Sequence, residues 1–390
     1  MAKDPSNHHT QIELVVIEPS PISTQPSHAG VSKSTILPIL ARFHAGYFRI
    51  SLSLCSQALL WKTLGEPMPE AHSLRPLLRR LPAKAFVLLW VVALLTLISL
   101  SLLYTLKCLL QFNKVKDEFS NRIGVNYLFA PWISWLLLLQ SSPFFNPNTA
   151  LYVVLWWVFI VPILVMDVKI YGQWFTKGKR FLSGVANPTS QLSVIGNLVA
   201  ALAAARMGWK EAAVGLFALG MAHYLVLFVT LYQRLAGSDC LLPAILRPVL
   251  FLFFAAPSVA SLAWDSIAGS FDNPSKMLFF LSLFLFLSLV SRPALFRKSM
   301  KKFDVAWWAY SFPLTVLAIA SSEYAMEVNS AAAHVLMLLL SALSVLVSLA
   351  LLLFTALNTN LLLLPPKDPF QAINPPAAAA SVATANCSAV

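Results

Sequence analysis

Apolar residues form long uncharged runs along the chain, and short polar segments connect them. Nine runs contain no Asp, Glu, Lys or Arg: 85–106, 123–145, 149–166, 185–205, 212–233, 248–264, 277–291, 305–322 and 331–357. A helix needs about 20 mostly apolar residues to cross the hydrocarbon core of a bilayer. A tenth run, 43–61, is interrupted by Arg49. The pattern predicts an all-α integral membrane protein with ten transmembrane helices.

An even number of crossings places both ends of the chain on one side of the membrane. If that side is the cytosol, the cytosolic loops hold fifteen Lys and Arg and the opposite loops hold eight. The positive-inside rule then favours cytosolic termini, although the first loop, with five of the eight, opposes it. We expect a disordered cytosolic tail at 1–40, a membrane domain at 41–362 and a disordered cytosolic tail at 363–390.

The composition excludes a soluble protein. Hydrophobic residues make up 58% of the chain and charged residues only 11%, which is too few to cover a water-facing surface. The net charge of +12 comes from residues that fall mostly between the apolar runs, so they set orientation and do not indicate nucleic-acid binding. The four cysteines are scattered without a CxxC pair, and no catalytic or nucleotide-binding motif is present. We therefore expect no metal, no cofactor and no enzymatic activity.

Prolines mark alternate runs. We number the ten runs along the chain, with 43–61 as the first. Pro131, Pro188, Pro257 and Pro313 then lie in the third, fifth, seventh and ninth runs, in small or polar surroundings. Proline breaks the helical hydrogen-bond ladder, and the freed groups are tolerated in a membrane only where protein covers them or a wet cavity meets them. This predicts an inner ring of bent odd-numbered helices around a central pore, with even-numbered helices facing lipid. The alternative is a helix bundle with ordinary packing kinks, and Pro162 in the fourth run breaks the alternation.

Several residues are candidates for the wall of such a pore. The fifth run is the most polar; its Asn187, Thr189 and Ser193 would line a pore or bond neighbouring helices. Arg49 would attract anions or extend to the membrane surface. Aromatic candidates are Phe48, Phe129 and Phe312. Phe312 precedes Pro313 and could form a hydrophobic constriction, although a lipid-facing or core position is the usual place for a phenylalanine.

Charged side chains offer little for coupled transport. Asp167 closes the fourth run and is expected at the membrane interface, so no carboxylate is expected in mid-membrane, where proton-coupled pumps use Asp or Glu. Selectivity would then come from weaker fields. Helix amino-terminal ends carry partial positive charge, which favours anions.

Seven strings resemble one known family. They are FRISLSLCSQALLW at 48–61, KIYGQW at 169–174, VANP at 185–188, AHYLV at 222–226, TLYQR at 230–234, AAPS at 255–258 and VAWWAYSFP at 305–313. Together they resemble the plant slow-type (S-type, guard-cell) anion channels, within the tellurite-resistance/dicarboxylate transporter superfamily. The likeness covers roughly residues 40–360, and the short tails resemble the short-tailed homologues.

The resemblance implies a fold and a function. It implies ten helices as five hairpins, a homotrimer with one pore in each protomer, and conduction of chloride and nitrate across the plasma membrane. It also implies that Phe312 is the gate. His44 and Arg49 depart from the family pattern, which often has proline and a small residue there. The family's long amino-terminal tail is missing, so a protein kinase partner would have to act elsewhere, with Ser299 as a candidate.

Two other functions stay open. The chain could be a secondary transporter of organic anions such as malate. It could also be a modulatory subunit in a heteromer with related channel subunits.

Overall fold

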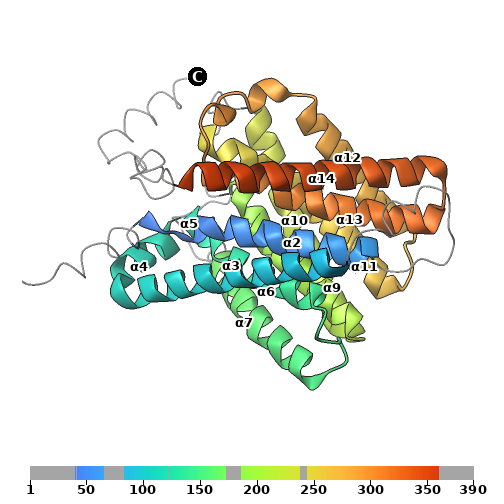
Figure 1. Cartoon of the computed structure of the whole chain (residues 1–390), viewed down its shortest axis with the longest axis horizontal. Helices are drawn as coiled ribbons and strands as arrows, with labels where there is room; N and C mark the ends of the chain where they lie inside the picture. Colours follow the sequence, from blue (N-terminus) through green and yellow to red (C-terminus); the bar gives the residue numbers. More distant parts are fainter. Residues whose placement is uncertain are drawn as a thin grey trace, which may run out of the picture.

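Helices form almost all of the described chain. The computed structural model describes residues 40, 42–65, 83–121, 123–172, 186–237 and 244–359 (Figure 1). Apart from Leu40, the tails predicted at 1–40 and 363–390 lie outside the described residues. No strand occurs in the described ranges, so the all-α class predicted from the apolar runs is confirmed.

The elements alternate between short helical turns and long helices. In chain order they are η1 (Ala45–Tyr47), α2 (Phe48–Gly65), α3 (Ala83–Leu110), α4 (Phe112–Ser120), α5 (Gly124–Tyr127), α6 (Phe129–Ser141), α7 (Ala150–Gly172), η3 (Pro188–Ser190), α9 (Gln191–Arg206), α10 (Lys210–Gly237), η4 (Ala244–Phe251), α11 (Leu252–Ala268), α12 (Asn273–Val290), η5 (Pro293–Leu295), η6 (Ser299–Lys301), η7 (Val305–Tyr310), α13 (Ser311–Val328) and α14 (Ala331–Leu357).

Eight helices of the described chain are long and apolar enough to cross a membrane. A ninth span results if α4 and the α5–α6 segment, which meet at a sharp bend, are counted as one. The helix α2 does not reach this apolar standard because Arg49, Gln57 and Lys62 lower its hydropathy, yet it is buried among other helices. The predicted count of ten crossings, grouped as five hairpins, stays a prediction.

Five helices form a closed cycle of contacts. The helix α2 packs on α6, α6 on α9, α9 on α11, α11 on α13, and α13 back on α2. Within the described part of the chain, close packing joins neighbours in this cycle and not helices across it. We call these five helices the ring. They come from the first, third, fifth, seventh and ninth apolar runs.

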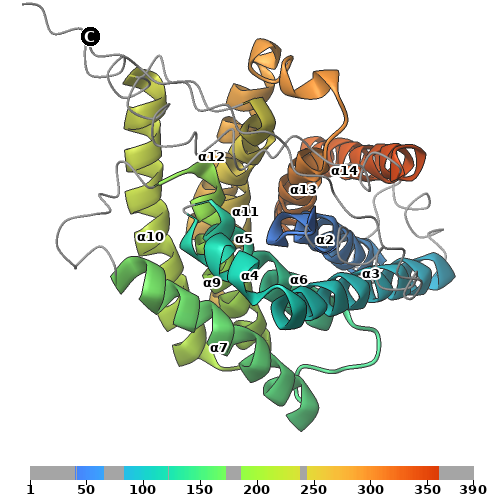
Figure 2. The ribbon, with the colours of Figure 1, turned by 90° about the vertical axis from the view of Figure 1, so that its left-hand side faces the viewer.

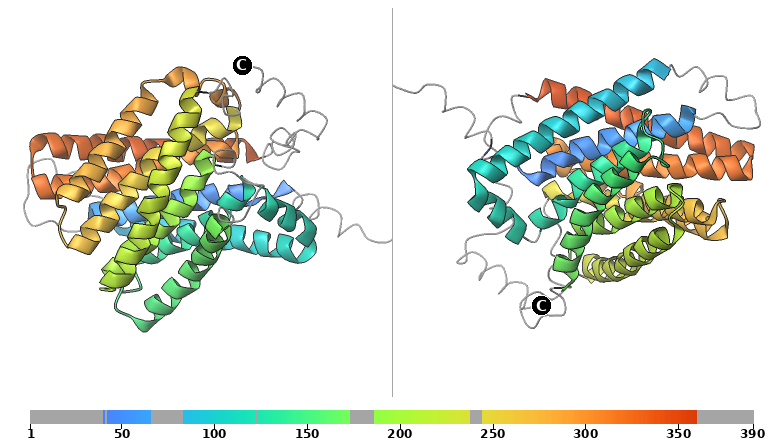
Figure 3. Two further views of the ribbon diagram at one scale, coloured as in Figure 1. Left: turned by 180° about the vertical axis from the view of Figure 1, so that it is seen from behind. Right: turned by 90° about the horizontal axis from the view of Figure 1, so that it is seen from below.

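Five further helices surround the ring. Each helix of the ring packs against the long helix that follows it: α2 against α3, α6 against α7, α9 against α10, α11 against α12, and α13 against α14. Figure 2 shows α3, α7, α10, α12 and α14 at the periphery with the ring helices inside them, and Figure 3 shows the same arrangement from two further sides. In the spans of α9, α11 and α13, 83–89% of residues are buried, against 17–39% in the peripheral helices.

The peripheral helices present large apolar side chains to the outside. Leu88, Leu102, Val168, Met277 and Leu346 are more than half exposed, among many others of their kind. Water would make such a surface unfavourable, whereas lipid tails solvate it. The chain is therefore a multi-pass membrane protein whose peripheral helices shield the ring.

The third apolar run does not form one continuous helix. It contains α5 and α6, which are separated by Leu128, and the amphipathic α4 lies before it, beyond Arg122. The prediction made for this run was a bent helix, and the structure divides it at Leu128. Asn126 donates to Thr189 of η3 at 3.0 Å, and the ring of Tyr127 lies 4.8 Å from the guanidinium of Arg49.

Candidate functional site

Every helix of the ring begins with a short turn. The turns are η1 before α2, α5 before α6, η3 before α9, η4 before α11 and η7 before α13. These turns also contact one another in a cycle: α5 with η1, η1 with η7, η7 with η4, η4 with η3, and η3 with α5. Because the turns meet in the same order as their helices, the five helices run parallel and start at one end of the ring. We call this end the turn layer.

Polar side chains accept hydrogen bonds from backbone N–H groups at the start of four of the five turns. Oδ1 of Asn187 accepts a hydrogen bond from the backbone N–H of Thr189 at 3.0 Å, and Oδ1 of Asp304 accepts one from Ala306 at 2.7 Å. Asn121 accepts from Ile123 at 2.9 Å, and Nδ1 of His44 accepts from Gly46 at 3.1 Å. Each cap satisfies only part of the amino-terminal N–H groups of its helix. The turn layer therefore gathers five positive helix ends.

The prolines lie near these turns and not in mid-helix as the kink argument implied. Pro188 is the first residue of η3, and Pro131 and Pro313 are the third residues of α6 and α13. Proline is tolerated there because a first-turn N–H lacks a helical partner anyway. Of the four, only Pro257 lies beyond the first turn of its α-helix. Three of the four prolines are buried, whereas Pro131 is partly exposed.

Phe312 is the second residue of α13, two residues beyond the end of η7. Its side chain is only 1% exposed. Ser311 bonds α14 through Ser348 at 2.7 Å, while Tyr324 stacks on Phe279 of α12. Successive residues of an α-helix turn by about 100°, which places Phe312 about 100° from Ser311 and about 120° from Tyr324. It therefore lies on neither outward face but on the side of α13 that faces the ring.

The other aromatic and basic candidates lie at the same end of the molecule. Phe48 packs edge-on against Tyr104 of α3 at 6.0 Å between ring centroids, so its ring is directed to a peripheral helix. Phe129 is fully buried at the start of α6. Arg49 is 8% exposed; its Nε donates to the carbonyl of Gly46 at 2.8 Å, and its guanidinium lies 4.8 Å from the ring centroid of Tyr127.

The polar residues of the fifth run divide between the turn layer and the helix contacts. Asn187 and Thr189 bond each other in η3, and Thr189 also accepts from Asn126 Nδ2 of α5 at 3.0 Å. Ser193 bonds the hydroxyl of Tyr171 on α7. Asn187 and Thr189 are therefore part of the turn layer. Ser193 faces a peripheral helix, which agrees with the alternative prediction that the polar residues of this run bond neighbouring helices.

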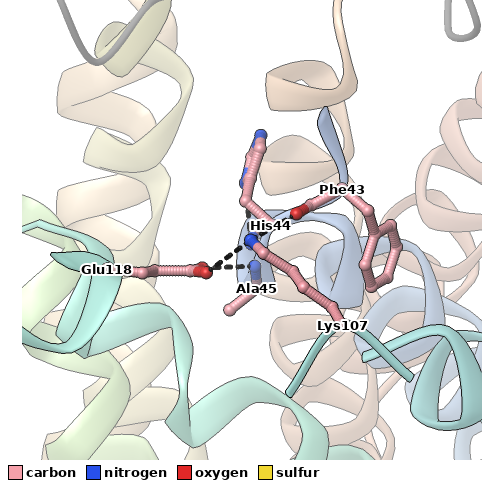
Figure 4. Close-up of polar contacts among 6 residues, drawn as sticks. Phe43, His44, Ala45, Lys107 and Glu118 are labelled. Atoms are coloured by element: carbon pink, nitrogen blue, oxygen red, sulfur yellow. Dashed lines mark hydrogen bonds and ion pairs between the residues drawn. The ribbon is translucent and has the colours of Figure 1, made fainter. Parts of the chain in front are cut away.

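A buried ion pair ties the turn layer to the peripheral helices, and the sequence analysis did not identify it. Glu118 of α4 accepts from Lys107 Nζ of α3 at 3.1 Å and from the backbone N–H of Ala45 at 2.6 Å (Figure 4). Lys107 also donates to the carbonyl of Phe43 at 2.6 Å. Both charged side chains are about 5% exposed. They join α3 and α4 to the start of α2.

Asp167 is buried in the protein, which the sequence did not indicate. It is 3% exposed, and its Oδ2 accepts from Asn197 Nδ2 of α9 at 2.6 Å. Asn197, one turn after Ser193, holds the carboxylate against α9, and the membrane-interface position predicted for Asp167 stays a prediction. Asn197 belongs to the fifth run and Asp167 follows the fourth, 30 residues earlier. Nothing in the local sequence around Asn197 indicates that it bonds this carboxylate.

Comparisons with known proteins decide the family. A family model described as voltage-dependent anion channel matches residues 42–356. The chain belongs to the S-type anion channel family. It is 58% identical over 355 residues to S-type anion channel SLAH1 of Arabidopsis thaliana, covering 91% of each chain. It is 60% identical over 328 residues to S-type anion channel SLAH4 of the same plant, covering 84% of this chain and 87% of that one.

A longer relative matches as well. The guard cell S-type anion channel SLAC1 of Arabidopsis thaliana is 45% identical over 310 residues, which are 79% of this chain and 54% of that relative. The family resemblance drawn from the seven strings is thereby confirmed. S-type anion channels are channels and not enzymes, and the ring with its turn layer is the part of this member where an anion path is to be sought.

Proposed function

We propose that the chain is a passive anion channel that conducts chloride and nitrate across the plasma membrane and is gated by Phe312. The observation that carries the proposal is the ring itself. Among the described residues, five parallel helices pack closely against their neighbours around a ring, and their starting turns contact one another in the same order. Such a ring provides an axial path that protein shields from lipid on all sides.

The charges of the ring suit an anion path that binds weakly. Five helix amino-terminal ends meet in the turn layer, each equivalent to roughly half a positive charge. Within the ring helices the chain has few formal charges, so an anion is attracted without being held tightly. Recording currents from the chain alone, with chloride and then nitrate as the permeant ion, tests the proposal. A membrane that stays as electrically silent as one without the protein would contradict it for the homomer.

The gate is tested by shortening Phe312. A phenylalanine that narrows an apolar path blocks ions by excluding water, so Phe312→Ala is expected to raise basal current about tenfold or more. Phe312→Leu, which keeps more bulk, is expected to fall between Phe312→Ala and the wild type. The matched control is Phe284→Ala on α12, whose side chain is 65% exposed and far from the ring face.

Loss of a buried ring also destabilises a protein by about 3–5 kcal/mol, so the amount of folded protein in the membrane has to be measured in parallel. Equal basal current per folded Phe312→Ala and wild-type channel would remove the gate from the proposal and leave the channel in place.

A second function is favoured by the buried Asp167. A carboxylate enclosed between α7 and α9 is a candidate proton carrier, which would suit a secondary transporter of organic anions such as malate. Reversal potentials that follow the pH gradient, and that stop following it in Asp167→Asn, would establish this function. Reversal potentials that follow only the anion gradient would exclude it.

The assembly belongs to the proposal as well. We place the chain as a homotrimer, or as a heteromer with related subunits in which it modulates a conducting partner, with both termini in the cytosol. The exposed apolar faces of the peripheral helices provide surface for such contacts as well as for lipid. Co-expression with a conducting relative separates the roles, because a modulatory subunit changes the partner's current while giving none alone. Ser299, partly buried with its hydroxyl donating to Phe296 at 2.8 Å, is the residue to test with a kinase.

A further inference from the structure

We propose that Gln191 and Tyr127 form a binding site for a permeant inorganic anion, nitrate or chloride, in the turn layer. The inference rests on the proposed function, because it names the side chains that would receive the anion on its path. Tyr127 did not stand out in the sequence, and Gln191 was one of several polar residues in the fifth run that could line a pore or bond neighbouring helices. What distinguishes them is that their polar atoms are buried without partners.

Gln191 is the first residue of α9 and is fully buried. Both its Nε2 and its Oε1 lack a hydrogen-bond partner among the residues that the structure describes. Leaving a buried polar atom unpaired costs about 1–3 kcal/mol, and buried amides are almost always bonded to protein or to ordered water. An amide held in this way next to a helix start requires a partner from solution.

The position of Gln191 on its helix directs it away from the peripheral helix α7. Ser193 and Asn197 bond residues of α7, and the carbonyl of Ala200 accepts from Trp156 of α7 at 3.2 Å. At about 100° per residue, Gln191 lies on the opposite face of α9 from all three. Gly196 meets side chains of α6 and α7, and Leu198, about 20° from Gln191 around the helix, meets Gly220 of α10. The Gln191 face therefore lies next to the α10 contact and toward the remaining neighbour, the ring helix α11.

Tyr127 provides a second unpaired donor at the same end. It is 3% exposed in α5, and its hydroxyl has no hydrogen-bond partner in the described part of the chain. The α5 turn contacts both η3 and the start of α9, so Tyr127 and Gln191 are on adjacent members of the turn layer. The guanidinium of Arg49 lies over the Tyr127 ring at 4.8 Å, which adds positive charge to the same region.

The donors define the ligand class. An amide NH₂ and a phenolic O–H donate to a small anion, and the helix ends around them favour negative charge. No Lys or Arg side chain is needed as a direct ligand, so the site would bind a monovalent anion weakly enough to release it. A polyvalent anion such as sulfate would not find the charge to offset its loss of hydration.

The experiment measures binding separately from conduction. The purified full-length protein is heated in detergent with nitrate, chloride, or the large anion gluconate at equal ionic strength. We expect nitrate and chloride to raise the unfolding temperature of the wild type relative to gluconate, since a ligand of the folded state stabilises it. Gln191→Leu is expected to weaken anion binding about tenfold and to remove most of this rise, and Tyr127→Phe is expected to reduce it.

Two features of the variants exclude a merely structural role. In gluconate, Gln191→Leu is expected to be as stable as the wild type or more so, because an unpaired buried amide is replaced by an apolar side chain of similar size. Gln191→Glu, which differs by charge alone, is expected to abolish the anion-dependent rise and to reduce the selectivity for anions over cations in current recordings. The matched control is Gln233→Leu at an exposed position of α10, which is expected to behave as the wild type.

The outcomes separate the two proposals. An anion-dependent rise that is present in the wild type and lost in Gln191→Leu supports the site even if the chain alone carries no current, and then only the proposed conduction fails. A rise that persists unchanged in Gln191→Leu overturns the site even if the chain conducts. A wild type that shows no rise with either anion overturns it too.

Discussion

Replacing Glu118 by glutamine removes one charge of the ion pair that joins α3 and α4 to the start of α2. Glutamine can still accept from the backbone N–H of Ala45 through its carbonyl oxygen, but its NH₂ group then faces the ammonium of Lys107 in place of Oε2. Breaking a buried ion pair by removing one partner typically destabilises a protein by about 3–5 kcal/mol. Because glutamine keeps one of the two hydrogen bonds, we expect a loss near 3 kcal/mol.

The expected change is measurable as a shift in unfolding temperature. With an unfolding entropy of about 2.1 cal/mol/K per residue, a domain spanning residues 42–356 shifts by about 1.5 °C per kcal/mol, so Glu118→Gln should lower it by about 5 °C. Tryptophan fluorescence of the purified protein on heating provides the readout, since the chain contains 11 tryptophans. Lys107→Met should lower the temperature by a similar amount, and combining the two substitutions should restore most of the loss because no unpaired charge is left.

The chain contains a matched control. Lys276 and Glu327 form an ion pair at 3.6 Å with side chains 28% and 42% exposed. Exposed pairs contribute about 0–1 kcal/mol, so Glu327→Gln is expected to lower the unfolding temperature by no more than about 1.5 °C. The reasoning is refuted if Glu118→Gln lowers the unfolding temperature no further than Glu327→Gln does. It is also refuted if the double variant is less stable than both single variants, because an unpaired buried charge would then not be the cause of the loss.

Two other buried contacts give predictions of the same kind. Gln57→Leu removes an amide whose Nε2 lies 2.9 Å from the hydroxyl of Thr315 and 2.8 and 2.7 Å from the hydroxyls of Ser344 and Ser348. The hydroxyls keep other partners, so thermal unfolding should reveal a loss of about 1–2 kcal/mol, and a wild-type transition would refute the contribution. Asn197→Leu leaves the Asp167 carboxylate without its 2.6 Å donor and should destabilise the protein by about 3 kcal/mol. Adding Asp167→Asn should recover most of this stability. No recovery would mean that Asn197 stabilises the protein through packing alone.

The sequence was sufficient for the membrane class and for the division between ring and periphery. Uncharged runs near 20 residues predict spans whatever the fold, and every run after the first that forms a ring helix contains a proline, although Pro162 in the peripheral helix α7 breaks the alternation. The position of those prolines was not predictable in the same way. Pro188 and Pro313 fit the first turn of a helix as well as they would kink its middle, and only the structure shows that Pro188 begins the short turn η3 and that η7 precedes Pro313.

The contacts of the turn layer depend on residues far apart in sequence. Glu118 reaches the backbone of Ala45 across 73 positions, and Gln57 reaches Ser344 across 287. No local pattern specifies such pairs. One signal was available and was not used: Asn187 and Asp304 stand just before short turns, where Asn and Asp are the preferred caps, and Asn121 does the same for α5.

Because the turn layer lies at one end only, the two entrances of the ring are electrically unlike. An anion that arrives at the helix starts meets an attractive field at once, whereas one from the other side first meets the carboxyl-terminal ends, which repel it. Under identical solutions on both sides, anion flow in the two directions is therefore expected to differ in size at equal and opposite voltages. This rectification is a property of the backbone and would persist after substitution of any single side chain.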